Sequence, residues 1–300
     1  ATAPIGRGRQ VLLGHVAVGE QVSAHRPGFA GLAVNEAVHA TLRERQVLQH
    51  PQLTIVIVAG PVAVQPHHRQ VRYGWWVRRV MIVGGSGHAS CVVDAAQAGS
   101  TLEVVAVVDD GAAGSAGGAS TSTVLGVPVV GGTDAVAPWW SEGRIDGVVI
   151  GVGDNHTRLV VAERLARTVP GLAFVAVVHP TASVAASARI GDGAVVLAGA
   201  SIGPQAAIDV HALLGAQANL DHDATMAAGS SLGPGALTGG TVSIGRAAAV
   251  AMGAIVRHGL TIGDDSVLGA GAVLTRSLPD RVVAWGSPAE VMRTRQPGDR

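Results

Sequence analysis

The chain has 300 residues, of which 48% are apolar and 14% charged, and its formal net charge is 0. This composition excludes a disordered chain, and the balanced charge excludes a global basic field that would attract nucleic acid. The single cysteine excludes an internal disulfide framework, and no apolar run reaches the about 20 residues that span a bilayer. We therefore expect a cytoplasmic protein of about two domains. Its interior should be closed by small aliphatic residues, because only 3% of the residues are aromatic.

Residues 1–76 differ from the rest of the chain in charge and pattern. They carry seven Arg, three Glu and no Asp, a net charge of +4, whereas fourteen Arg and eighteen acidic residues give residues 77–300 a net charge of −4. They show neither a repeat nor a clear alternation of strands and helices. Two interpretations are open: a flexible, disordered extension, or sequence upstream of a natural start near Val77 or Met81. We favour the second and assign this segment no function.

Residues 77–178 are predicted to form an α/β domain. The expected order is a buried strand, a helix, a second strand, two further short strands, an amphipathic helix and a last strand. The corresponding segments are Val80–Val83, Ser90–Ala98, Glu103–Val108, Val127–Val130, Gly147–Ile150, Asn155–Thr168 and Leu172–Val178. This alternation predicts a Rossmann-like parallel sheet with right-handed crossovers.

A glycine-rich turn, residues 84–87, follows the first strand, and Asp109 stands at the end of the next one. Such a turn lets the backbone approach a phosphate at a helix N-terminus, and a carboxylate at that place commonly accepts ribose hydroxyls. The full dinucleotide fingerprint, counted from Gly85, requires a third glycine where Ser90 stands. The pattern therefore argues against NAD and is compatible with a nucleotide-sugar. A tight turn that binds nothing is the alternative.

The segment from Val184 to Leu274 repeats every six residues. An aliphatic residue or Met occupies fifteen of the sixteen positions, and Thr238 is the exception. Ala or Ser stands two residues earlier in fourteen hexads, and Gly follows directly in eight. A period of six excludes a helix and fits a parallel β-helix of about five 18-residue coils. We expect the aliphatic side chains to point inward, and the glycines to adopt a backbone conformation that other residues resist.

Within this repeat, Asp221-His222-Asp223 carries the most evident chemistry. An imidazole beside a carboxylate can be oriented by it and can accept a proton near neutral pH. A solvated histidine on a polar turn is the alternative. His258 follows 36 residues later, two coils away, which is too far to share a metal ion. β-Helical carbonic anhydrases place zinc ligands at n, n+36 and n+41, but the third position here is Gly263. We therefore expect no metal.

The chain from about residue 79 to 293 resembles the bacterial sugar O-/N-acetyltransferases of the sialic acid O-acetyltransferase group, which includes the UDP-4-amino-sugar N-acetyltransferases. The landmarks run in order along the chain: Gly84-Gly85-Ser86-Gly87-His88, Val108-Asp109-Asp110, Gly151-Val152-Gly153-Asp154-Asn155, His179-Pro180-Thr181-Ala182-Ser183-Val184, Asp221-His222-Asp223 and Gly286-Ser287-Pro288-Ala289. The resemblance implies a nucleotide-sugar-binding domain over 77–178, a left-handed β-helix of hexapeptide repeats over 179–280 and a C-terminal tail over 281–300. It also implies a homotrimer with acetyl-CoA bound between adjacent β-helices.

The resemblance further implies which residues act and what they do. His222 matches the catalytic base, and Asp223 matches the acid that raises its basicity. Residues at positions that bind the sugar are Ser86, Gly87, His88, Asp109, Asp110 and Gly240, and those at coenzyme positions are Ser231, Met252 and Ala270. The implied reaction moves an acetyl group from acetyl-CoA to an amine or hydroxyl of a sugar. A nucleotide-activated sugar is the expected acceptor, and a free sugar is the alternative.

Three positions depart from the pattern of this group. Ser231 stands where relatives often carry a second histidine, Gly215 where the N-acetyltransferases commonly carry Asn, and Ser287 where Asn is usual before Pro. The first two bear on the identity of the substrate and are also compatible with an inactive nucleotide-sugar-binding trimer. A serine- or maltose-type acetyltransferase fits less well, because those solenoids normally lack this N-terminal domain.

Overall fold

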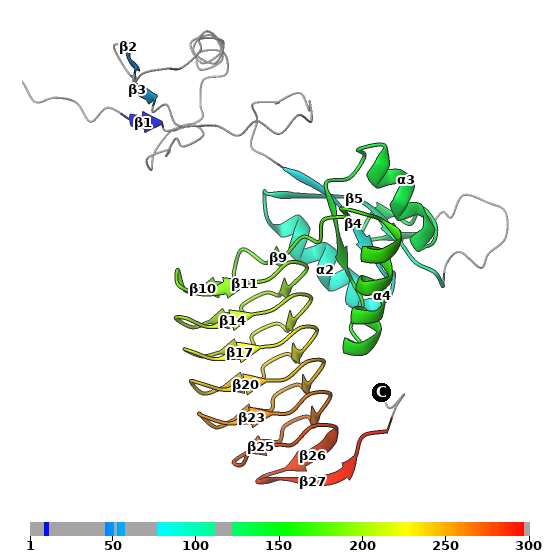
Figure 1. Ribbon diagram of the computed structural model, residues 1–300, viewed down its shortest axis with the longest axis vertical. Helices are drawn as coiled ribbons and strands as arrows, with labels where there is room; N and C mark the ends of the chain where they lie inside the picture. Colours follow the sequence, from blue (N-terminus) through cyan, green and yellow to red (C-terminus); the bar gives the residue numbers. More distant parts are fainter. Residues whose placement is uncertain (1–8, 12–45, 51–52, 58–76, 112–121, 297–300) are drawn as a thin grey trace, which may run out of the picture. The chain divides into compact units, whose positions relative to one another are not determined.

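The structure, a computed structural model, describes residues 9–11, 46–50, 53–57, 77–111 and 122–296 (Figure 1). The chain divides into two units, Ala1–Trp75 and Trp76–Arg300. In the first unit three short strands form a sheet in the order β1-β3-β2: β1 (Arg9–Val11), β2 (Gln46–His50) and β3 (Leu53–Ile57). The rest of residues 1–76 lies outside the described residues, so our interpretation of that segment stays a prediction.

The second unit begins with a small α/β domain around a parallel sheet in the order β5-β4-β8. Its strands are β4 (Arg78–Val83), β5 (Leu102–Val108) and β8 (Gly147–Ile150), with a hairpin of β6 (Thr123–Val124) and β7 (Val127–Pro128). Its helices are α2 (Gly87–Ala98), α3 (Val136–Ser141) and α4 (Asn155–Thr168), with a 3₁₀ turn η1 (Thr133–Ala135) before α3. The predicted parallel α/β domain is thereby confirmed.

The central strand β4 is buried because helices cover both faces of the sheet. Val80 and Ile82 pack in one cluster with residues of α2, whereas Met81 and Val83 pack in another with residues of α3 and α4. Successive side chains of a strand point to opposite faces, so a strand covered on both sides becomes a continuous apolar run. This explains why Val80–Val83 is recognisable in the sequence.

One predicted strand of this domain, Leu172–Val178, is wrong as a single element. Phe174 forms an isolated bridge with Val148 of the α/β sheet, but β9 (Val177–Val178) pairs with β12 (Val195–Val196) of the solenoid. The chain changes sheets within these few residues, and the local pattern of apolar residues does not reveal the change of partner.

The solenoid consists of two-residue strands, each ending on the residue that the six-residue period selects. They are β10 (Ser183–Val184), β11 (Arg189–Ile190), β12 (Val195–Val196), β13 (Ser201–Ile202), β14 (Ala207–Ile208), β15 (Leu213–Leu214), β16 (Asn219–Leu220), β17 (Thr225–Met226), β18 (Ser231–Leu232), β19 (Leu237–Thr238), β20 (Ser243–Ile244), β21 (Ala249–Val250), β22 (Ile255–Val256), β23 (Thr261–Ile262), β24 (Val267–Leu268) and β25 (Val273–Leu274). Each strand from β10 to β22 pairs in parallel with the strand 18 residues later, as Ser183 does with Ser201 and Ile255 does with Val273. At the C-terminal end the offset falls to 16 residues, where β24 pairs with β26. Three hexads per coil are confirmed.

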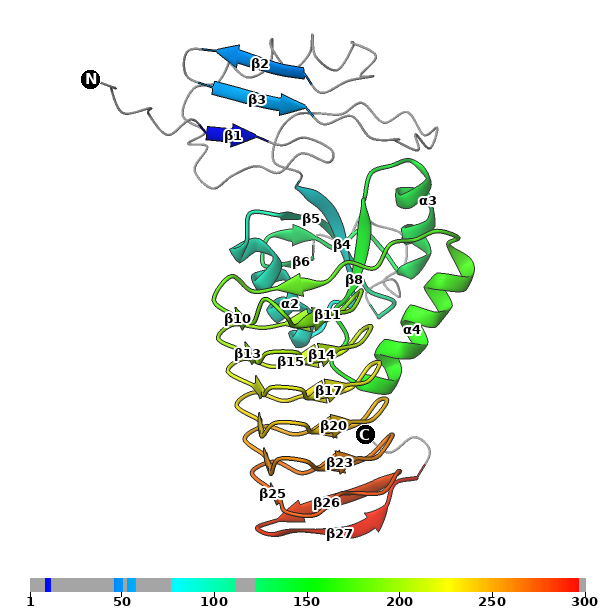
Figure 2. The ribbon, with the colours of Figure 1, turned by 60° about the vertical axis from the view of Figure 1, so that its left-hand side comes forward.

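The strands form three faces of a prism, which Figure 2 shows from the side. The β10 face has the order β10-β13-β16-β19-β22-β25, and the β11 face has the order β11-β14-β17-β20-β23. The β12 face is longer, because β9 and the hairpin of β26 (Val282–Gly286) and β27 (Ala289–Thr294) continue its ladder at the two ends. The solenoid therefore reaches about six coils rather than the five expected.

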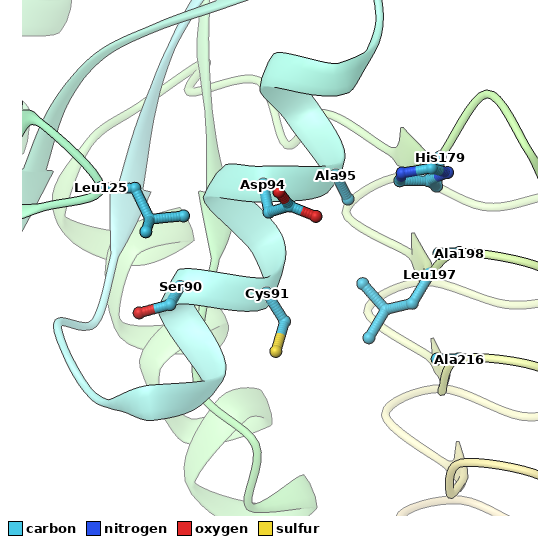
Figure 3. A pocket seen from close by; sticks show the side chains of 9 residues that line it. All are labelled: Ser90, Cys91, Asp94, Ala95, Leu125, His179, Leu197, Ala198 and Ala216. Atoms are coloured by element: carbon cyan, nitrogen blue, oxygen red, sulfur yellow. The ribbon is translucent and has the colours of Figure 1, made fainter.

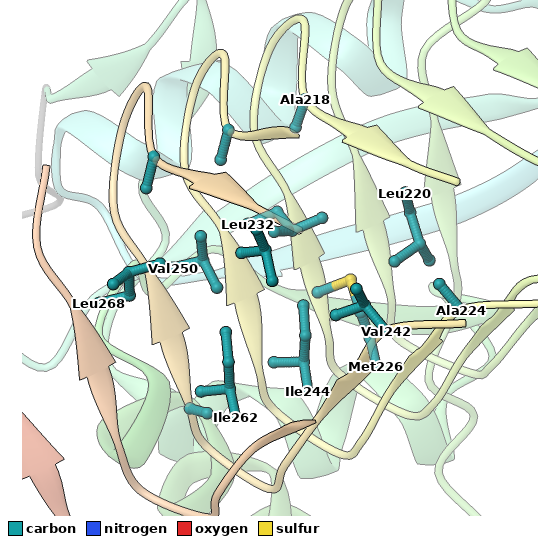
Figure 4. Close-up of a cluster of buried hydrophobic side chains, with 14 of the residues drawn as sticks. Ala218, Leu220, Ala224, Met226, Leu232, Val242, Ile244, Val250, Ile262 and Leu268 are labelled. Carbon is teal, nitrogen blue, oxygen red and sulfur yellow. The ribbon is translucent and has the colours of Figure 1, made fainter. Parts of the chain in front are cut away.

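The core of the solenoid is a column of aliphatic side chains contributed by all three faces (Figure 4). Leu214, Leu220 and Leu232 are fully buried, and the small residues two positions earlier, such as Ala218, are buried as well. Small side chains at these positions let the corners close around the inward aliphatic groups, and close packing of this kind excludes voids. This arrangement replaces the aromatic core that the composition excludes.

The glycines that follow the inward residues are there for a different reason from the one predicted. The left-handed backbone conformation occurs two residues after these glycines. Gln205 (φ 60°) and Ala247 (φ 55°) occupy that position in two hexads, and other glycines, such as Gly199, occupy it in further hexads. At Gly233, by contrast, an added Cβ would lie 2.7 Å from the backbone nitrogen of Met252 in the next coil. These glycines are therefore required by the close approach of neighbouring coils and not by their own φ angle.

Among the described residues, no helix is long and apolar enough to cross a membrane.

Candidate active site

His222 lies in the turn between β16 and β17, at the corner where the β10 face meets the β11 face. Its backbone N–H donates to Oδ1 of Asp221 at 2.7 Å, which tightens the turn before the imidazole. The next residue, Asp223, adopts the left-handed backbone conformation with φ 57°. The His222 side chain is 55% exposed, so a substrate can approach it from solvent.

The imidazole of His222 is paired with the carboxylate of Asp223. Nδ1 of His222 and Oδ2 of Asp223 lie 2.8 Å apart. A carboxylate only accepts hydrogen bonds, so Nδ1 is the donor and the lone pair of the neutral ring is on Nε2. The hydrogen bond that His222 donates to Asp223 raises the pKa of His222, and the negative charges of Asp221 and Asp223 act in the same direction. The arrangement supplies an oriented base of raised basicity.

Gly240 occupies the same corner one coil later and lies against the His222 ring. An added Cβ at Gly240 would overlap Cε1 and Nε2 of His222. The absence of a side chain at position 240 therefore leaves the space that the imidazole occupies, with Nε2 and Cε1 against the backbone of the next coil. The structure thus brings His222, Asp223 and Gly240 together, as three of the residues selected from the sequence.

His258 lies one further coil along the same corner, where Gly239 packs against its backbone. Gly240 and its coil separate it from His222, since each coil takes 18 residues. Within residues 77–111 and 122–296 no three His, Cys, Asp or Glu side chains are grouped so that they could hold a metal ion.

In the α/β domain, the glycine-rich turn packs on the end of β5. Gly85 lies against Asp109, because an added Cβ would overlap the Asp109 carboxylate. Ser86 precedes α2 in an extended conformation, and its side chain makes no capping hydrogen bond. Gly87, the first residue of α2, has open space where a side chain would be. The exposed N-terminal turn of α2 and Asp109 are therefore adjacent, as the sequence pattern requires.

Asp110 is engaged within the protein. Its Oδ1 accepts hydrogen bonds from the Thr133 amide at 2.7 Å and the Thr133 hydroxyl at 2.8 Å, and its Oδ2 pairs with Arg164 at 2.9 Å. The Thr133 amide lowers the pKa of Asp110, and Arg164 and the Thr133 hydroxyl add to this effect. Asp110 thus holds η1 and α4 beside β5, and its predicted contact with a sugar stays a prediction.

His88, on the first turn of α2, is mostly buried against Gly153. Burial lowers its pKa, and the positive charge of Arg158 adds to the effect. A histidine in this environment is neutral near pH 7 and can form hydrogen bonds with an uncharged polar group.

The residues predicted for the coenzyme lie along the β12 face and one of its edges. Met252 and Ala270 occupy the corner between the β12 and β10 faces in successive coils, where the Gly271 amide donates to the Met252 carbonyl at 2.9 Å. Met252 is 62% exposed. Ser231 lies in β18 on the β12 face, and its hydroxyl accepts a hydrogen bond from Nδ2 of Asn155 at 3.0 Å.

Two residues to which the sequence analysis assigned no role, Asn155 and Arg158, join the α/β domain to the solenoid. Helix α4 begins after Asp154, whose carboxylate accepts the Thr157 amide at 2.8 Å. One turn inside the helix, Arg158 is 1% exposed and donates to the carbonyls of His211 at 2.7 Å and Gly229 at 2.9 Å. Burial lowers the pKa of Arg158 to about 10. The signal for Arg158 in the sequence is an arginine on the apolar side of an amphipathic helix, and the signal for Asn155 is its place in the landmark Gly151-Val152-Gly153-Asp154-Asn155.

These contacts fix where the α/β domain sits on the solenoid. Helix α2 packs on Val195 and Leu197, and α4 binds the corner between the β11 and β12 faces. The domain therefore lies over the β12 face and against its corner with the β11 face, whereas Met252 at the other corner stays exposed. His222 lies at the third corner, opposite that face. Within one chain, the structure does not bring His222 together with the turn at residues 86–88.

A cavity of about 330 Å³ lies where α2 faces the solenoid (Figure 3). Its walls are largely apolar. The lining residues are Ser90, Cys91, Asp94, Ala95, Leu125, His179, Leu197, Ala198 and Ala216. His222 and Asp223 are not among them, so this cavity is separate from the hydrogen-bonded pair that they form.

Comparison with known proteins decides the family. The PglD N-terminal domain family matches residues 79–165. The structure of a mutant GDP-perosamine N-acetyl transferase from Caulobacter crescentus, in complex with CoA and GDP-perosamine, is 37% identical with a TM-score of 0.65. The match covers 71% of this chain and 96% of that one. The chain belongs to the hexapeptide-repeat family of sugar acetyltransferases. The family and the left-handed β-helix expected from the sequence are thus confirmed.

Other members of this family are also similar to the chain. The acetyltransferase domain of PglB from Neisseria gonorrhoeae, solved in complex with acetyl coenzyme A, is 28% identical with a TM-score of 0.63 over 72% of this chain and 100% of that one. Galactoside O-acetyltransferase from Escherichia coli is 49% identical over 39 residues, 13% of this chain. The chain spans about a fifth of the length of the curated relatives that it matches.

Proposed function

We propose that this chain transfers an acetyl group from acetyl-CoA to a sugar that is activated by a nucleotide, with His222 as the general base. The observation that carries the proposal is the hydrogen bond between Nδ1 of His222 and Asp223 at 2.8 Å, which leaves Nε2 free above Gly240. The similar structures in complex with CoA and GDP-perosamine, or with acetyl coenzyme A, support the two substrates. GDP-perosamine N-acetyl transferase is similar over 96% of its length, which favours an amine as the acceptor.

The reaction follows from the free Nε2. Nε2 of His222 takes a proton from the acceptor amine as its nitrogen attacks the thioester carbonyl. A carbon–nitrogen bond forms, the carbon–sulfur bond breaks, and the proton on Nε2 passes to the departing CoA sulfur. Asp223 stabilises the imidazolium that exists between these steps. Positioning of the two substrates supplies much of the remaining rate enhancement.

The site requires more than one chain in this proposal. His222 lies at one edge of the β10 face, and Met252 and Ala270 lie at the other edge. The turn at residues 86–88 lies on the domain that covers the β12 face. A neighbouring copy in a homotrimer would bring its own coenzyme edge and α/β domain to this His222. We propose that Ser86, Gly87, His88 and Asp109 hold the nucleotide-sugar, and that Met252, Ala270 and Ser231 line the coenzyme site.

The test measures release of CoA thiol by the full chain from acetyl-CoA. The acceptors are GDP-perosamine, UDP- and dTDP-amino-sugars, and free sialic acid. We expect turnover with one nucleotide-sugar and a loss of about 100-fold or more in His222→Ala. His258→Ala is the matched control, because this exposed histidine lies at the same corner two coils away and should keep full activity.

The same experiment separates catalysis from binding alone. The departure at Ser231, whose hydroxyl is held by Asn155, keeps an inactive nucleotide-sugar-binding protein as the second candidate. No turnover with any acceptor, together with failure to bind CoA in calorimetry, would reject the enzyme. Equal loss of activity in both histidine variants would reject His222 as the specific base.

A further inference from the structure

Thr238 is the one polar residue among the sixteen inward positions of the six-residue repeat. It is 4% exposed and lies in β19, one coil after the strand that leads into His222. A hydroxyl in an aliphatic interior is unfavourable unless it is hydrogen-bonded, so a valine or isoleucine would pack there at lower cost. The bonds that this hydroxyl makes therefore need an explanation.

The backbone ladder between coils is irregular at Thr238. Elsewhere the amide of the residue after a strand donates to the main-chain carbonyl of the inward residue in the next coil. The Gly203 amide donates in this way to the Leu220 carbonyl at 2.8 Å, and the Gly239 amide to the Val256 carbonyl at 2.9 Å. The amide of Asp221 donates instead to the hydroxyl of Thr238 at 3.1 Å. Thr238 thus replaces a main-chain acceptor with its side chain.

A second side chain completes the exchange. In a regular ladder the Thr238 carbonyl would accept the Asp221 amide. Here it accepts a hydrogen bond from Nδ2 of Asn219 at 3.1 Å, and the Thr238 hydroxyl donates to the Asn219 carbonyl at 3.3 Å. The strands β16 and β19 are accordingly paired only at Asn219 and Leu237, whereas the pairs of strands on either side are joined at two positions. The Asp221 amide and the hydroxyl and carbonyl of Thr238 thus all have partners, but through a local exchange.

The exchange lies directly before His222. The Asp221 amide is held by the Thr238 hydroxyl, and the Asp221 carboxylate accepts the His222 amide at 2.7 Å. The carboxylate of Asp223 in turn accepts a hydrogen bond from the His222 ring. We propose that Thr238 is a positioning residue for His222: its buried hydroxyl takes the Asp221 amide out of the regular ladder and so sets the turn that presents the imidazole. This inference rests on the proposed role of His222. With an aliphatic residue at 238, the Asp221 amide can return to the main-chain carbonyl, and the turn shifts.

The test compares three variants of the full chain in the thiol-release assay. Thr238→Val removes the hydroxyl at nearly constant shape, and we expect kcat to fall about tenfold while KM for both substrates is unchanged. Thr238→Ser keeps the hydroxyl, so its kcat should stay within about twofold of that of the unsubstituted protein.

Ser266→Ala is the matched control. Ser266 is also buried, its hydroxyl also accepts a main-chain amide, from Val282 at 3.1 Å, and it also donates to a carbonyl, that of Pro279 at 2.7 Å. It lies at the far end of the solenoid, so Ser266→Ala should lower the melting temperature but leave kcat within about twofold of the unsubstituted protein.

A second readout does not depend on turnover. Proton–nitrogen NMR of protein with labelled histidine gives the titration of each ring, and His222→Ala identifies the His222 signal. We expect Thr238→Val to shift the His222 titration and Ser266→Ala not to.

Unchanged kcat and unchanged titration in Thr238→Val would overturn the proposal, whereas a shifted titration in a protein without turnover would contradict only the proposed function. If Thr238→Val fails to fold, Asn219→Ala breaks the other half of the exchange from the partly exposed side of the strand, and the same two outcomes apply.

Discussion

His222 and Asp223 are neighbours in the chain, and their side chains nevertheless meet. The left-handed backbone at Asp223 (φ 57°) turns its carboxylate back to Nδ1 of His222, at 2.8 Å. The sequence shows that a base and an acid are adjacent, but adjacency alone does not decide whether they are hydrogen-bonded. The chemistry of the pair therefore depends on the turn as much as on the residue types.

Asp223→Asn should move the pH dependence of the reaction. The hydrogen bond to Asp223 raises the pKa of His222, and the base acts only when it is neutral, so activity rises as the pH increases through that pKa. Removing the carboxylate lowers the pKa, and the rising limb of kcat/KM should move to lower pH. The plateau should fall by about tenfold or more, because the imidazolium loses its partner. Initial rates across the pH range measure both effects, and an unmoved limb would show that Asp223 does not act on the base.

Gly240→Ala should remove activity without unfolding the protein. The added Cβ would overlap the His222 ring, which is exposed and can rotate away, so the backbone need not move. We expect a fall in kcat of about 100-fold and a small change in melting temperature. Gly99→Ala is a suitable control, because its nearest neighbour would be the Ala96 carbonyl oxygen at 3.8 Å. Retained activity in Gly240→Ala would mean that the ring does not act from this position.

At the scale of strands and helices, the period of six was sufficient to place each strand of the solenoid, because inward and outward positions repeat without insertions. It was not sufficient to explain the glycines, since close approach between coils depends on residues 18 positions apart. Nor did it reveal that β9 leaves the α/β sheet for the solenoid. His222 and Asp223 were recognisable by type and resemblance, but Thr238 and Arg158 act through backbone carbonyls and amides that a sequence pattern does not display.

Arg158→Met should weaken the junction between α4 and the solenoid. Arg158 is 1% exposed, and its guanidinium donates to main-chain carbonyls of the α/β domain and of the solenoid. The variant leaves these carbonyls without that donor, and those of His211 and Gly229 are in buried contacts. We expect the free energy of unfolding to fall by about 3 kcal/mol or more. Arg164→Met, on the same helix, is the control: its ion pair with Asp110 is about half exposed and should contribute less than about 1 kcal/mol. Urea denaturation of the full-length variants compares the two, and equal midpoints would contradict the role of Arg158.

At the scale of the whole molecule, the position of the α/β domain separates the two halves of the proposed site, which are His222 with Asp223 and the turn at residues 86–88. The domain covers the β12 face through α2 and α4, and His222 lies at the corner opposite that face. Both halves are present in one chain, yet they face different directions. Catalysis by the proposed mechanism therefore requires that the His222 of one copy meet the α/β domain of another. Symmetric association satisfies this condition for all copies at once.

Mixed assemblies of two inactive variants test this arrangement. His222→Ala removes the base, and Ser86→Trp blocks the exposed start of α2 without replacing any capping bond. Each variant alone should be inactive. Co-expressed in equal amounts, they should recover about a quarter of the unsubstituted activity, because a site draws its base and its sugar-binding turn independently from two chains. If both groups of a site came from the same chain, every site in the mixture would lack one of them, and activity would stay at the level of the single variants. The assay on purified mixed assemblies, with the ratio of chains confirmed by mass spectrometry, distinguishes the two cases.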